Sequence, residues 1–555
     1  MKKQGPSTTT KMMNKMIRHS ITLLSLFLLI ACGSSEEVRV ILTSPVIPVL
    51  SGKPHNPVQQ VTLVRHDTAA YTLEQVTLTL SGSSDPADIT EIMLFASDGK
   101  GRPDTGRPMG SSRAPAGKVI IPTHLTVDAD TLSFWVTVTL REPVDLTHRV
   151  AVRCSEIVTD KGKVKIATGN GKPLRTGVAL RRHNQEGVHT SRIPGLATSK
   201  QGTLLAIFDA RYESARDLQG DMDIGLHRSL DGGHTWEPMQ VVLDMNEWGG
   251  LPEKYNGVSD ACILVDEKSG DIYVAGLWMH GLLDRETGKW VEGLTADSTR
   301  WIHQWQAKGS QPGFGVKETS QFLLTKSSDD GLTWGKPVNL THLKKEEWWL
   351  FAPAPGHGIT LSDGTLVLPT QGRDSEGKPF SNITWSKDGG ETWSTSNPAA
   401  TNTTECMAVE LNDGSIMLNM RDNRNRGNDT VNGRTIATTA DLGTTWNEHP
   451  TSRKALIEPT CMASIHRHHY REKGEEKSLL LFVNPASTSK RNNITLKVSC
   501  DDGNSWPEEK QILLDELSGR GYSCITSVDE ETIGILYESS QSDMVFQTIK
   551  LKEIL

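Results

Sequence analysis

The sequence predicts an all-β chain in which a β-sandwich is followed by a β-propeller. Three observations support this fold class. A turn motif that ends in tryptophan occurs five times between residues 229 and 506. The 49 glycines supply many residues suited to tight turns. Before residue 176 the motif is absent, and short runs of alternating residues rich in β-branched side chains take its place.

The repeated motif has the form Ser-x-Asp-x-Gly-x-Thr-Trp, and residues 386–393 (SKDGGETW) show all of its parts. We expect the Asp to accept bonds from backbone amides of its own turn, the Gly to adopt a positive φ and the Trp to pack beneath. The tryptophans are separated by 98, 59, 53 and 60 residues, a period typical of propeller blades. These turns are therefore predicted to be structural. The other copies begin at Ser229, Ser327, Thr439 and Ser499.

Length and composition limit the possible functions. A chain of 555 residues exceeds one ordinary core, so we expect two or more domains. The net charge is −8 and no basic patch stands out, which argues against a nucleic-acid partner. The seven cysteines form no Cys-x-x-Cys pair and no evident disulfide framework.

The N-terminus has the features of an export signal. Basic residues precede the apolar run 21–30, which is too short to span a bilayer but suits a signal peptide. The run ends in Leu-Ile-Ala-Cys32, which resembles a bacterial lipobox and implies lipidation of Cys32; a plain secretory signal is the alternative. We expect removal of residues 1–31, a lipidated tether at residues 32–37, and a lipid-anchored protein of the bacterial envelope, periplasmic or at the outer-membrane surface.

Residues 38–175 are predicted to form an antiparallel β-sandwich. The segment 131–140 (TLSFWVTVTL) alternates with β-branched and aromatic residues, which is a strong strand signal. Turn clusters such as residues 81–86 (SGSSDP) separate the runs, as in sandwich folds. The expected strands are residues 58–64, 71–80, 89–95, 118–121, 131–140 and 148–154.

Residues 176–555 are predicted to form the propeller, and four stretches there place a polar group beside an apolar strand. Arg192 precedes the expected strand 203–208, and Arg421 ends an apolar strand. Arg491 precedes another expected strand, and Tyr522 opens the last blade. Only a closed ring of blades, whose strand ends converge on its axis, would bring such distant residues together.

These motifs together resemble the bacterial exo-sialidase (neuraminidase) family, which is a six-bladed propeller. The turn motifs match its Asp boxes, or BNR repeats, and Ser-Arg-Ile-Pro around Arg192 matches its Arg-Ile-Pro motif without the usual preceding aromatic residue. Asp217 lies six residues after Arg211, and Glu405 lies sixteen before Arg421, as in the family. The resemblance covers roughly residues 180–555.

The region before the propeller resembles the N-terminal module found ahead of some bacterial sialidase propellers. That resemblance implies either a carbohydrate-binding role or a role as a spacer and packing partner.

The resemblance implies a role for each residue of the site. A carboxylate nucleophile would be repelled by the carboxylate of sialic acid, so the neutral phenol of Tyr522 would attack, with Glu405 removing its proton. Sialidases with a Tyr nucleophile are known exceptions to the two-carboxylate rule of glycosidases. Asp217 would protonate the leaving oxygen and later activate water. Three arginines would clamp the substrate carboxylate with charge-assisted bonds: Arg192, Arg421 and Arg491.

Four further residues receive roles by resemblance alone. Arg211 and Asp260 would contact the O4 and N-acyl side of the sugar. Glu538, sixteen residues after Tyr522, would orient the first arginine, and Gln371 would line the pocket or simply occupy a turn.

Two segments of the propeller region have alternative interpretations. Residues 278–314 lie in the long gap between the first two Asp boxes and carry several tryptophans. They are interpreted as a blade without an Asp box plus a packed loop, as a wall that contacts the leaving sugar, or as both. Residues 466–469 (HRHH) lack a carboxylate or Cys at ligand spacing, so we interpret them as a surface loop and expect no metal and no cofactor.

The sequence therefore favours a retaining exo-α-sialidase that acts on terminal sialic acid of mucins, other glycoproteins, oligosaccharides and glycolipids such as gangliosides. A trans-sialidase or intramolecular trans-sialidase would share all the site residues, and a non-catalytic sialoglycan-binding propeller would need only the arginines. Linkage preference and oligomeric state stay open at this point.

Overall fold

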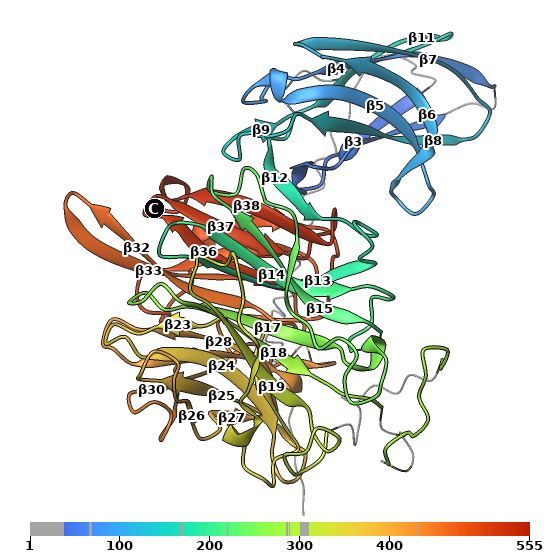
Figure 1. Cartoon of the computed structure of the whole chain (residues 1–555). Coiled ribbons are helices and arrows are strands. Elements are labelled where there is room, and N and C mark those ends of the chain that lie inside the picture. The colour runs from blue at the N-terminus through green and yellow to red at the C-terminus, as the bar shows by residue number, and fades with distance from the viewer. Residues whose placement is uncertain are drawn as a thin grey trace, which may run out of the picture.

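Strands dominate the computed structural model, which describes residues 38–65, 69–166, 169, 171–218, 220–282, 284, 287, 289–299, 310–428 and 430–555. Within these ranges every helical element is a three-residue 3-10 turn: η1 (Pro86–Asp88), η2 (Glu253–Tyr255), η3 (Thr341–Leu343), η4 (Asn423–Asn425), η5 (Glu508–Lys510) and η6 (Leu551–Glu553). None of the described helices is long and apolar enough to cross a membrane. Figure 1 shows two bodies, with the N-terminal strands above and the later sheets below. Cys32 lies outside the described residues.

The N-terminal body is a β-sandwich, as predicted. Buried Val61 and Phe134 of one sheet pack in the same core as Leu73 and Leu78 of the other. The first sheet has the order β1 (Val38–Thr43), β3 (Asn56–Arg65), β8 (Thr131–Leu140), β5 (Ile89–Ser97) and β6 (Pro103–Arg113). The second has the order β11 (Gly162–Lys165), β10 (Arg153–Thr159), β4 (Tyr71–Thr79) and β7 (Lys118–Val127).

The second body consists, within the described residues, of six sheets. The first joins both ends of the region: β2 (Val49–Ser51), β12 (Leu174–Arg181), β38 (Met544–Lys550), β37 (Thr532–Tyr537) and β36 (Ser523–Asp529), with β9 (Arg149–Val150) beside β12. The second is β13 (Thr190–Thr198), β14 (Leu204–Arg211), β15 (Met222–Ser229) and β16 (Gln240–Leu243). The third is β20 (Val338–Asn339), β19 (Gln321–Ser327), β18 (Ile272–Trp278), β17 (Val258–Val265) and β22 (Gly356–His357).

Three more sheets complete this body. The fourth is β21 (Leu350–Pro353), β24 (Leu366–Arg373), β25 (Pro379–Ser386) and β26 (Ser394–Thr395), with β23 (Ile359–Thr360) and β27 (Ala400–Thr401) at its sides. The fifth is β28 (Thr403–Glu410), β29 (Ile416–Asp422), β30 (Thr435–Thr439) and β31 (Asn447–Glu448). The sixth is β32 (Ser464–Glu472), β33 (Glu475–Pro485), β34 (Ile494–Ser499) and β35 (Gln511–Asp515).

The six sheets form a closed ring. Strand β13 contacts β17, β17 contacts β22 and β24, β24 contacts β28, β28 contacts β32, β32 contacts β36, and β36 contacts β13 again. The ring is closed by hydrogen-bonded strand pairing, because β12 from its start pairs antiparallel with β38 from its end, with Val178 opposite Phe546. Figure 1 shows the teal β12 beside the red C-terminal strands. The strands that adjoin one another around the ring, such as β13, β17 and β28, therefore begin near one axis.

One segment crosses between the two bodies. Residues 38–175 were predicted to form the sandwich, but the short strand β2 within this range pairs in parallel with β12 of the first propeller sheet. Arg149 of β9 and Arg175 of β12 both bond the Glu553 carboxylate at 2.7 Å, so the last turn of the chain is tied to the strands that follow the sandwich. The sandwich is therefore anchored to the blade that closes the ring.

The Asp boxes have the predicted structural role. Asp388 accepts bonds from the Thr392 amide (2.9 Å) and hydroxyl (2.6 Å), Gly390 has φ +84°, and the Trp393 indole donates to the Gly390 carbonyl at 3.0 Å. The five copies join the third and fourth strands of the second to sixth sheets.

The Asp boxes lie at the strand ends that are farther from Arg421. In the fifth sheet Ile416 pairs with Thr439, the first residue of its box, whereas Met420, next to Arg421, pairs with Thr435 at the other end. The boxes therefore fix one face of the ring, and the arginine lies toward the opposite face.

Two interpretations of the propeller sequence were wrong. The long gap after the first box contains no extra blade among the described residues, because residues 279–320 are an insertion between β18 and β19 of the third sheet. The sheet without a box is the one that closes the ring. His466 and His468 do not lie in a surface loop, since both belong to β32, where His468 is buried and bonds the Ser527 hydroxyl. Trp301 and Trp305 of the insertion lie outside the described residues.

Candidate active site

Local irregularities in three inner strands aim side chains at the axis. The pairing register shifts between Arg192 and Gly195 in β13, between Ser259 and Cys262 in β17, and between Thr403 and Cys406 in β28. Such bulges re-aim side chains and are frequent beside functional sites. Ile193 (φ +61°) and Asp260 (φ +55°) adopt the left-handed conformation at these points.

A phenol and a carboxylate meet at the centre of the site. The Tyr522 hydroxyl donates a hydrogen bond to Glu405 Oε1. Arg421 Nη1 lies 2.5 Å from Glu405 Oε2 and 3.0 Å from the Tyr522 hydroxyl. Tyr522 is 5% exposed and Glu405 is 7% exposed, so the pair is largely screened from solvent. The arrangement provides a phenol beside a proton acceptor, both next to a fixed positive charge.

Two further arginines flank the same tyrosine. The guanidinium carbons of Arg192 and Arg491 each lie 5.4 Å from the centroid of the Tyr522 ring. Arg491 is held by the carbonyls of Arg520 (3.0 Å) and Thr460 (3.4 Å). The three predicted arginines therefore converge on Tyr522, which gives a concentrated positive site for an anionic group.

Glu538 connects the Arg192 side chain to the backbone at Tyr522. Its Oε1 accepts Arg192 Nε (2.5 Å) and the Ile193 amide (3.0 Å), while Oε2 accepts Arg192 Nη2 (3.4 Å) and the Tyr522 amide (3.1 Å). Burial opposes the charge of this carboxyl, but Arg192 and the two amides hold its pKa below the usual range. The geometry agrees with an orienting role for Glu538.

The surroundings keep the tyrosine protonated until a base acts on it. Burial and then Glu405 raise the pKa of the Tyr522 hydroxyl well above its usual range, although Arg421 and Arg491 act in the opposite sense. Because the hydroxyl donates to Glu405, this carboxylate is the nearest group that could accept its proton.

Asp217 lies in the loop after β14, on the open side of the site. Its side chain is 59% exposed, and Oδ1 lies 2.5 Å from Arg211 Nη1 and 3.9 Å from Arg192 Nη1. An exposed carboxyl next to the arginines can exchange protons with a bound group and with water. The structure thus brings Asp217 into the same cluster as the predicted arginines.

Arg211 and Asp260 belong to a buried network that the sequence did not reveal. Asp209 Oδ2 accepts Arg211 Nη2 at 2.8 Å and the Ser259 hydroxyl at 2.7 Å, and Asp209 Oδ1 accepts the Asp260 amide at 3.1 Å. Burial and then Asp209 raise the pKa of the Asp260 carboxyl well above its usual range. Asp209 is recognisable in hindsight because residues two apart on β14 share a face with Arg211.

A second buried ion pair near the site was also not predicted from the sequence. Glu458 is fully buried and accepts Arg434 Nη1 (2.6 Å) and the amide of Asp422 (2.7 Å), the residue after Arg421. Arg434 also donates to the Cys461 carbonyl at 2.8 Å, next to the Thr460 carbonyl that holds Arg491. This ion pair links the backbones that carry two of the arginines.

Gln371 is not joined to the catalytic cluster by hydrogen bonds among the described residues. It is buried in β24, where its side-chain amide donates to the Pro353 carbonyl at 3.3 Å. Its expected place in the pocket lining stays a prediction.

Comparisons with known proteins agree over most of the chain. A family model for the BNR repeat-like domain matches residues 193–537, and a model for the N-terminal domain of BNR-repeat neuraminidase matches residues 37–163. A sialidase of Bacteroides fragilis (strain YCH46) is 44% identical over 425 residues, which cover 76% of this chain and 74% of that protein. A sialidase of Micromonospora viridifaciens is 31% identical over 378 residues, covering 66% of this chain and 53% of that protein.

Solved structures give the same result. A Hadza microbial sialidase superposes with a TM-score of 0.83 at 35% sequence identity, covering 93% of this chain and 100% of that chain.

Proposed function

The chain belongs to the BNR-repeat neuraminidases and is an exo-α-sialidase, and we propose that it acts with retention of configuration through a covalent intermediate on Tyr522. The observation that carries this proposal is the Tyr522 hydroxyl, which donates to Glu405 while Arg421 lies 3.0 Å away. A phenol with an adjacent base and an adjacent cation is an activated nucleophile.

Substrate binding follows from the arginine cluster. The carboxylate of a terminal sialic acid would be held by Arg192, Arg421 and Arg491, which all lie against Tyr522. Planar guanidinium groups suit a carboxylate because they donate paired, charge-assisted bonds. This clamp would hold the anomeric carbon, which carries the carboxylate, near the phenolic oxygen. On the other side of the sugar, Arg211 and Asp260 would contact the O4 and N-acyl groups.

The first chemical step forms the intermediate. The Tyr522 oxygen bonds to the anomeric carbon as the glycosidic C–O bond breaks, and the phenolic proton passes to Glu405. Asp217, the exposed carboxyl beside the cluster, donates its proton to the leaving oxygen. General-acid assistance of this kind contributes about 10² to 10⁴ in rate.

The second step restores the enzyme. Asp217 removes a proton from water, the water oxygen bonds to the anomeric carbon, and the bond to Tyr522 breaks. Glu405 returns the proton to the phenolate. Two inversions give net retention, and the protein's own residues account for every proton transferred.

Incubation with a sialyl-lactose, followed by NMR of the released sugar, tests this function. We expect free sialic acid that appears first as the α-anomer and then mutarotates. First appearance of the β-anomer would contradict retention, and a sugar transferred to another hydroxyl or to its own glycerol arm would indicate a trans-sialidase. Binding without product would indicate a sialoglycan-binding propeller.

We further propose where the enzyme works. Export and lipidation at Cys32 would hold it in the bacterial envelope, and residues 32–37 would tether the sandwich that precedes the propeller. Sialylated glycoproteins such as mucins, and glycolipids such as gangliosides, would be its substrates. The lipobox-like sequence supports the anchor, and the sialidase relatives support sialylated glycans as substrates.

A further inference from the structure

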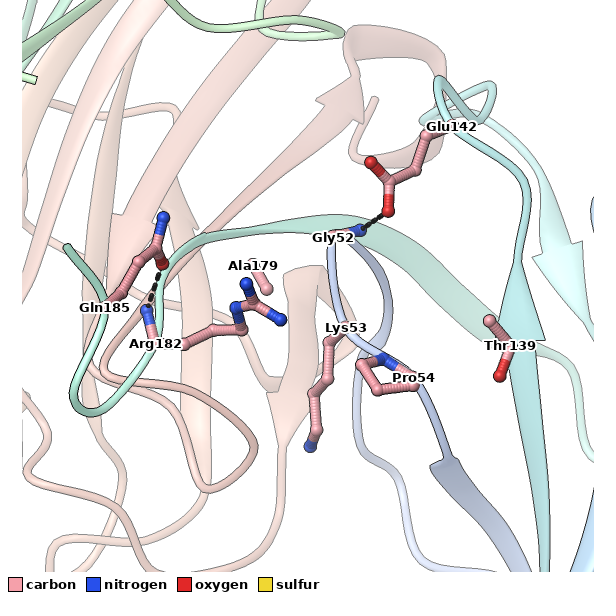
Figure 2. Close-up of a pocket in the computed structure, with 8 residues that line it drawn as sticks. All are labelled: Gly52, Lys53, Pro54, Thr139, Glu142, Ala179, Arg182 and Gln185. Atoms are coloured by element: carbon pink, nitrogen blue, oxygen red, sulfur yellow. Dashed lines mark hydrogen bonds between the residues drawn. The ribbon is translucent and has the colours of Figure 1, made fainter. Parts of the chain in front are cut away.

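A second polar pocket lies where the sandwich meets the propeller. It has a volume of about 380 Å³ and is lined by residues of both bodies, including Lys53, Thr139, Glu142, Arg182 and Gln185. Figure 2 shows the Arg182 side chain extending toward the loop formed by Gly52, Lys53 and Pro54. The volume falls within the range of small-molecule sites, roughly 300 to 1,000 Å³.

One cationic side chain of the pocket has no partner in the part of the chain that the structure describes. Among the described residues the Arg182 guanidinium makes no hydrogen bond or ion pair; only its backbone amide is engaged, by Gln185 Oε1 at 3.0 Å. Glu142 is engaged with the Gly52 amide at 2.9 Å, as Figure 2 shows. Lys53 lies on the facing wall and donates to the Gln541 carbonyl at 2.8 Å. The pocket therefore offers more positive than negative charge to a ligand.

Residues on both walls of the pocket are connected to segments that carry active-site residues. Lys53 bonds Gln541, which lies three residues after Glu538 and so within about 11 Å of it along the chain. Arg182 and Gln185 belong to the turn between β12 and β13, and β13 carries Arg192. The sheet order places β12 three strands from β36, a separation of about 14 Å, so a glycan would have to extend across this sheet from the active site to enter the pocket.

We propose that this pocket is a subsite for the carboxylate of a second acidic sugar in the same glycan chain. The inference rests on the proposed sialidase function, since it assigns a second contact to the substrate. Arg182 would supply the paired donors that suit a carboxylate, and the Lys53 ammonium would add a second charge. The residues that line the pocket include no aromatic side chain, so recognition would rely on charge and hydrogen bonds and not on stacking.

Three substrates separate this subsite from the catalytic site. They are an aryl sialoside, a monosialylated oligosaccharide, and a disialylated oligosaccharide of the same length that keeps its second sialic acid after cleavage. For Arg182→Ala we expect kcat/KM on the disialylated substrate to fall about tenfold, the usual loss for one hydrogen bond to a charged group. Activity on the other two substrates should stay within about twofold of wild type. Arg182→Lys should retain part of the preference, because it keeps the charge but loses the fork.

Arg113→Ala is the matched control, because Arg113 is also an exposed arginine of the N-terminal half of the chain but lies on β6 and does not line the pocket. It should leave all three substrates unchanged. Equal losses on every substrate with Arg182→Ala, or no loss on any, would overturn the subsite. If wild type hydrolyses the aryl sialoside normally, such a result rejects the subsite alone. Failure of wild type on all three substrates would reject the proposed function, and the subsite with it.

Discussion

Replacement of Glu538 by Gln removes one negative charge from the centre of the ring and changes little else in shape. The carboxylate is fully buried and accepts four hydrogen bonds, two at each oxygen. A glutamine amide keeps one acceptor oxygen and turns the other position into a donor. If the oxygen stays with Arg192 Nε and the Ile193 amide, the NH₂ group faces Arg192 Nη2 and the Tyr522 amide.

The expected loss of stability follows from those unpaired donors. Each buried donor left without an acceptor costs about 1 to 3 kcal/mol, so two cost about 2 to 6 kcal/mol. Breaking a buried ion pair by removal of one partner costs about 3 to 5 kcal/mol, which lies in the same range. We therefore expect Glu538→Gln to lower the free energy of unfolding by about 3 to 5 kcal/mol. Activity should fall by about 10- to 100-fold, because Arg192 loses the group that orients it.

The loss of unfolding free energy in Glu538→Gln should depend on pH in a defined direction. The pKa of Glu538 is lowered from 4.5 in the folded protein, so its ionised form stabilises the fold at pH values above 4.5. This contribution is lost as pH falls below 4.5 and through the folded pKa. Gln does not titrate. The difference in free energy of unfolding between wild type and Glu538→Gln should therefore be constant near neutral pH and should become smaller in acid.

Denaturant unfolding of both proteins at neutral pH and at several acidic pH values measures this difference, and turnover of an aryl sialoside measures activity. Glu391→Gln is the control, because Glu391 is exposed in an Asp-box turn. A loss of unfolding free energy below about 0.5 kcal/mol at neutral pH would refute the reasoning, since that is the range of an ordinary surface change. A deficit that is the same at every pH would refute the assignment to the Glu538 charge.

Three further changes have defined outcomes. Arg421→Lys should fold normally but lower kcat/KM about 100-fold, because one ammonium cannot reproduce the paired guanidinium bonds; unchanged kinetics would remove Arg421 from the clamp. Cys32→Ser should yield unlipidated protein with near-normal activity, and its continued partition into the detergent phase would contradict the lipobox. Asp388→Ala should lower the free energy of unfolding, since its box loses the acceptor for Thr392, while kcat stays normal; a loss of kcat would contradict a purely structural box.

The features that could be predicted from the sequence are the local ones. The side-chain bonds that Ser386, Asp388 and Trp393 make in the Asp box lie within eight residues, so composition and spacing were sufficient to describe them. The expected strand 148–154 is divided between β9 and β10, and β1, β6 and β11 were not expected. The other sandwich strands were readable, because alternation over ten residues, as at 131–140, has one strong interpretation. The short strand β2 (Val49–Ser51) was not, because three buried residues carry no periodicity.

The site residues could be predicted only from the family resemblance, because the residues that contact one another there are far apart in the sequence. Glu538 and Arg192 are 346 residues apart, and no local pattern links them. The bulges beside Arg192, Asp260 and Glu405 appear only as register shifts between paired strands, and no sequence pattern marks them. Asp209 was given no role from the sequence, because a buried carboxylate that pairs with Arg211 looks, in sequence, like any polar residue near a strand end.

Labelling with a 3-fluorosialyl fluoride tests the central claim most directly. The electron-poor sugar slows hydrolysis of the covalent intermediate, so peptide mass spectrometry can locate the bond. We expect the label on Tyr522 in wild type. In Tyr522→Phe we expect no label at that position, sialic acid binding through the intact arginines, and a turnover at least about 100-fold lower. A label on Glu405, or wild-type turnover by Tyr522→Phe, would contradict the assignment of Tyr522 as the nucleophile.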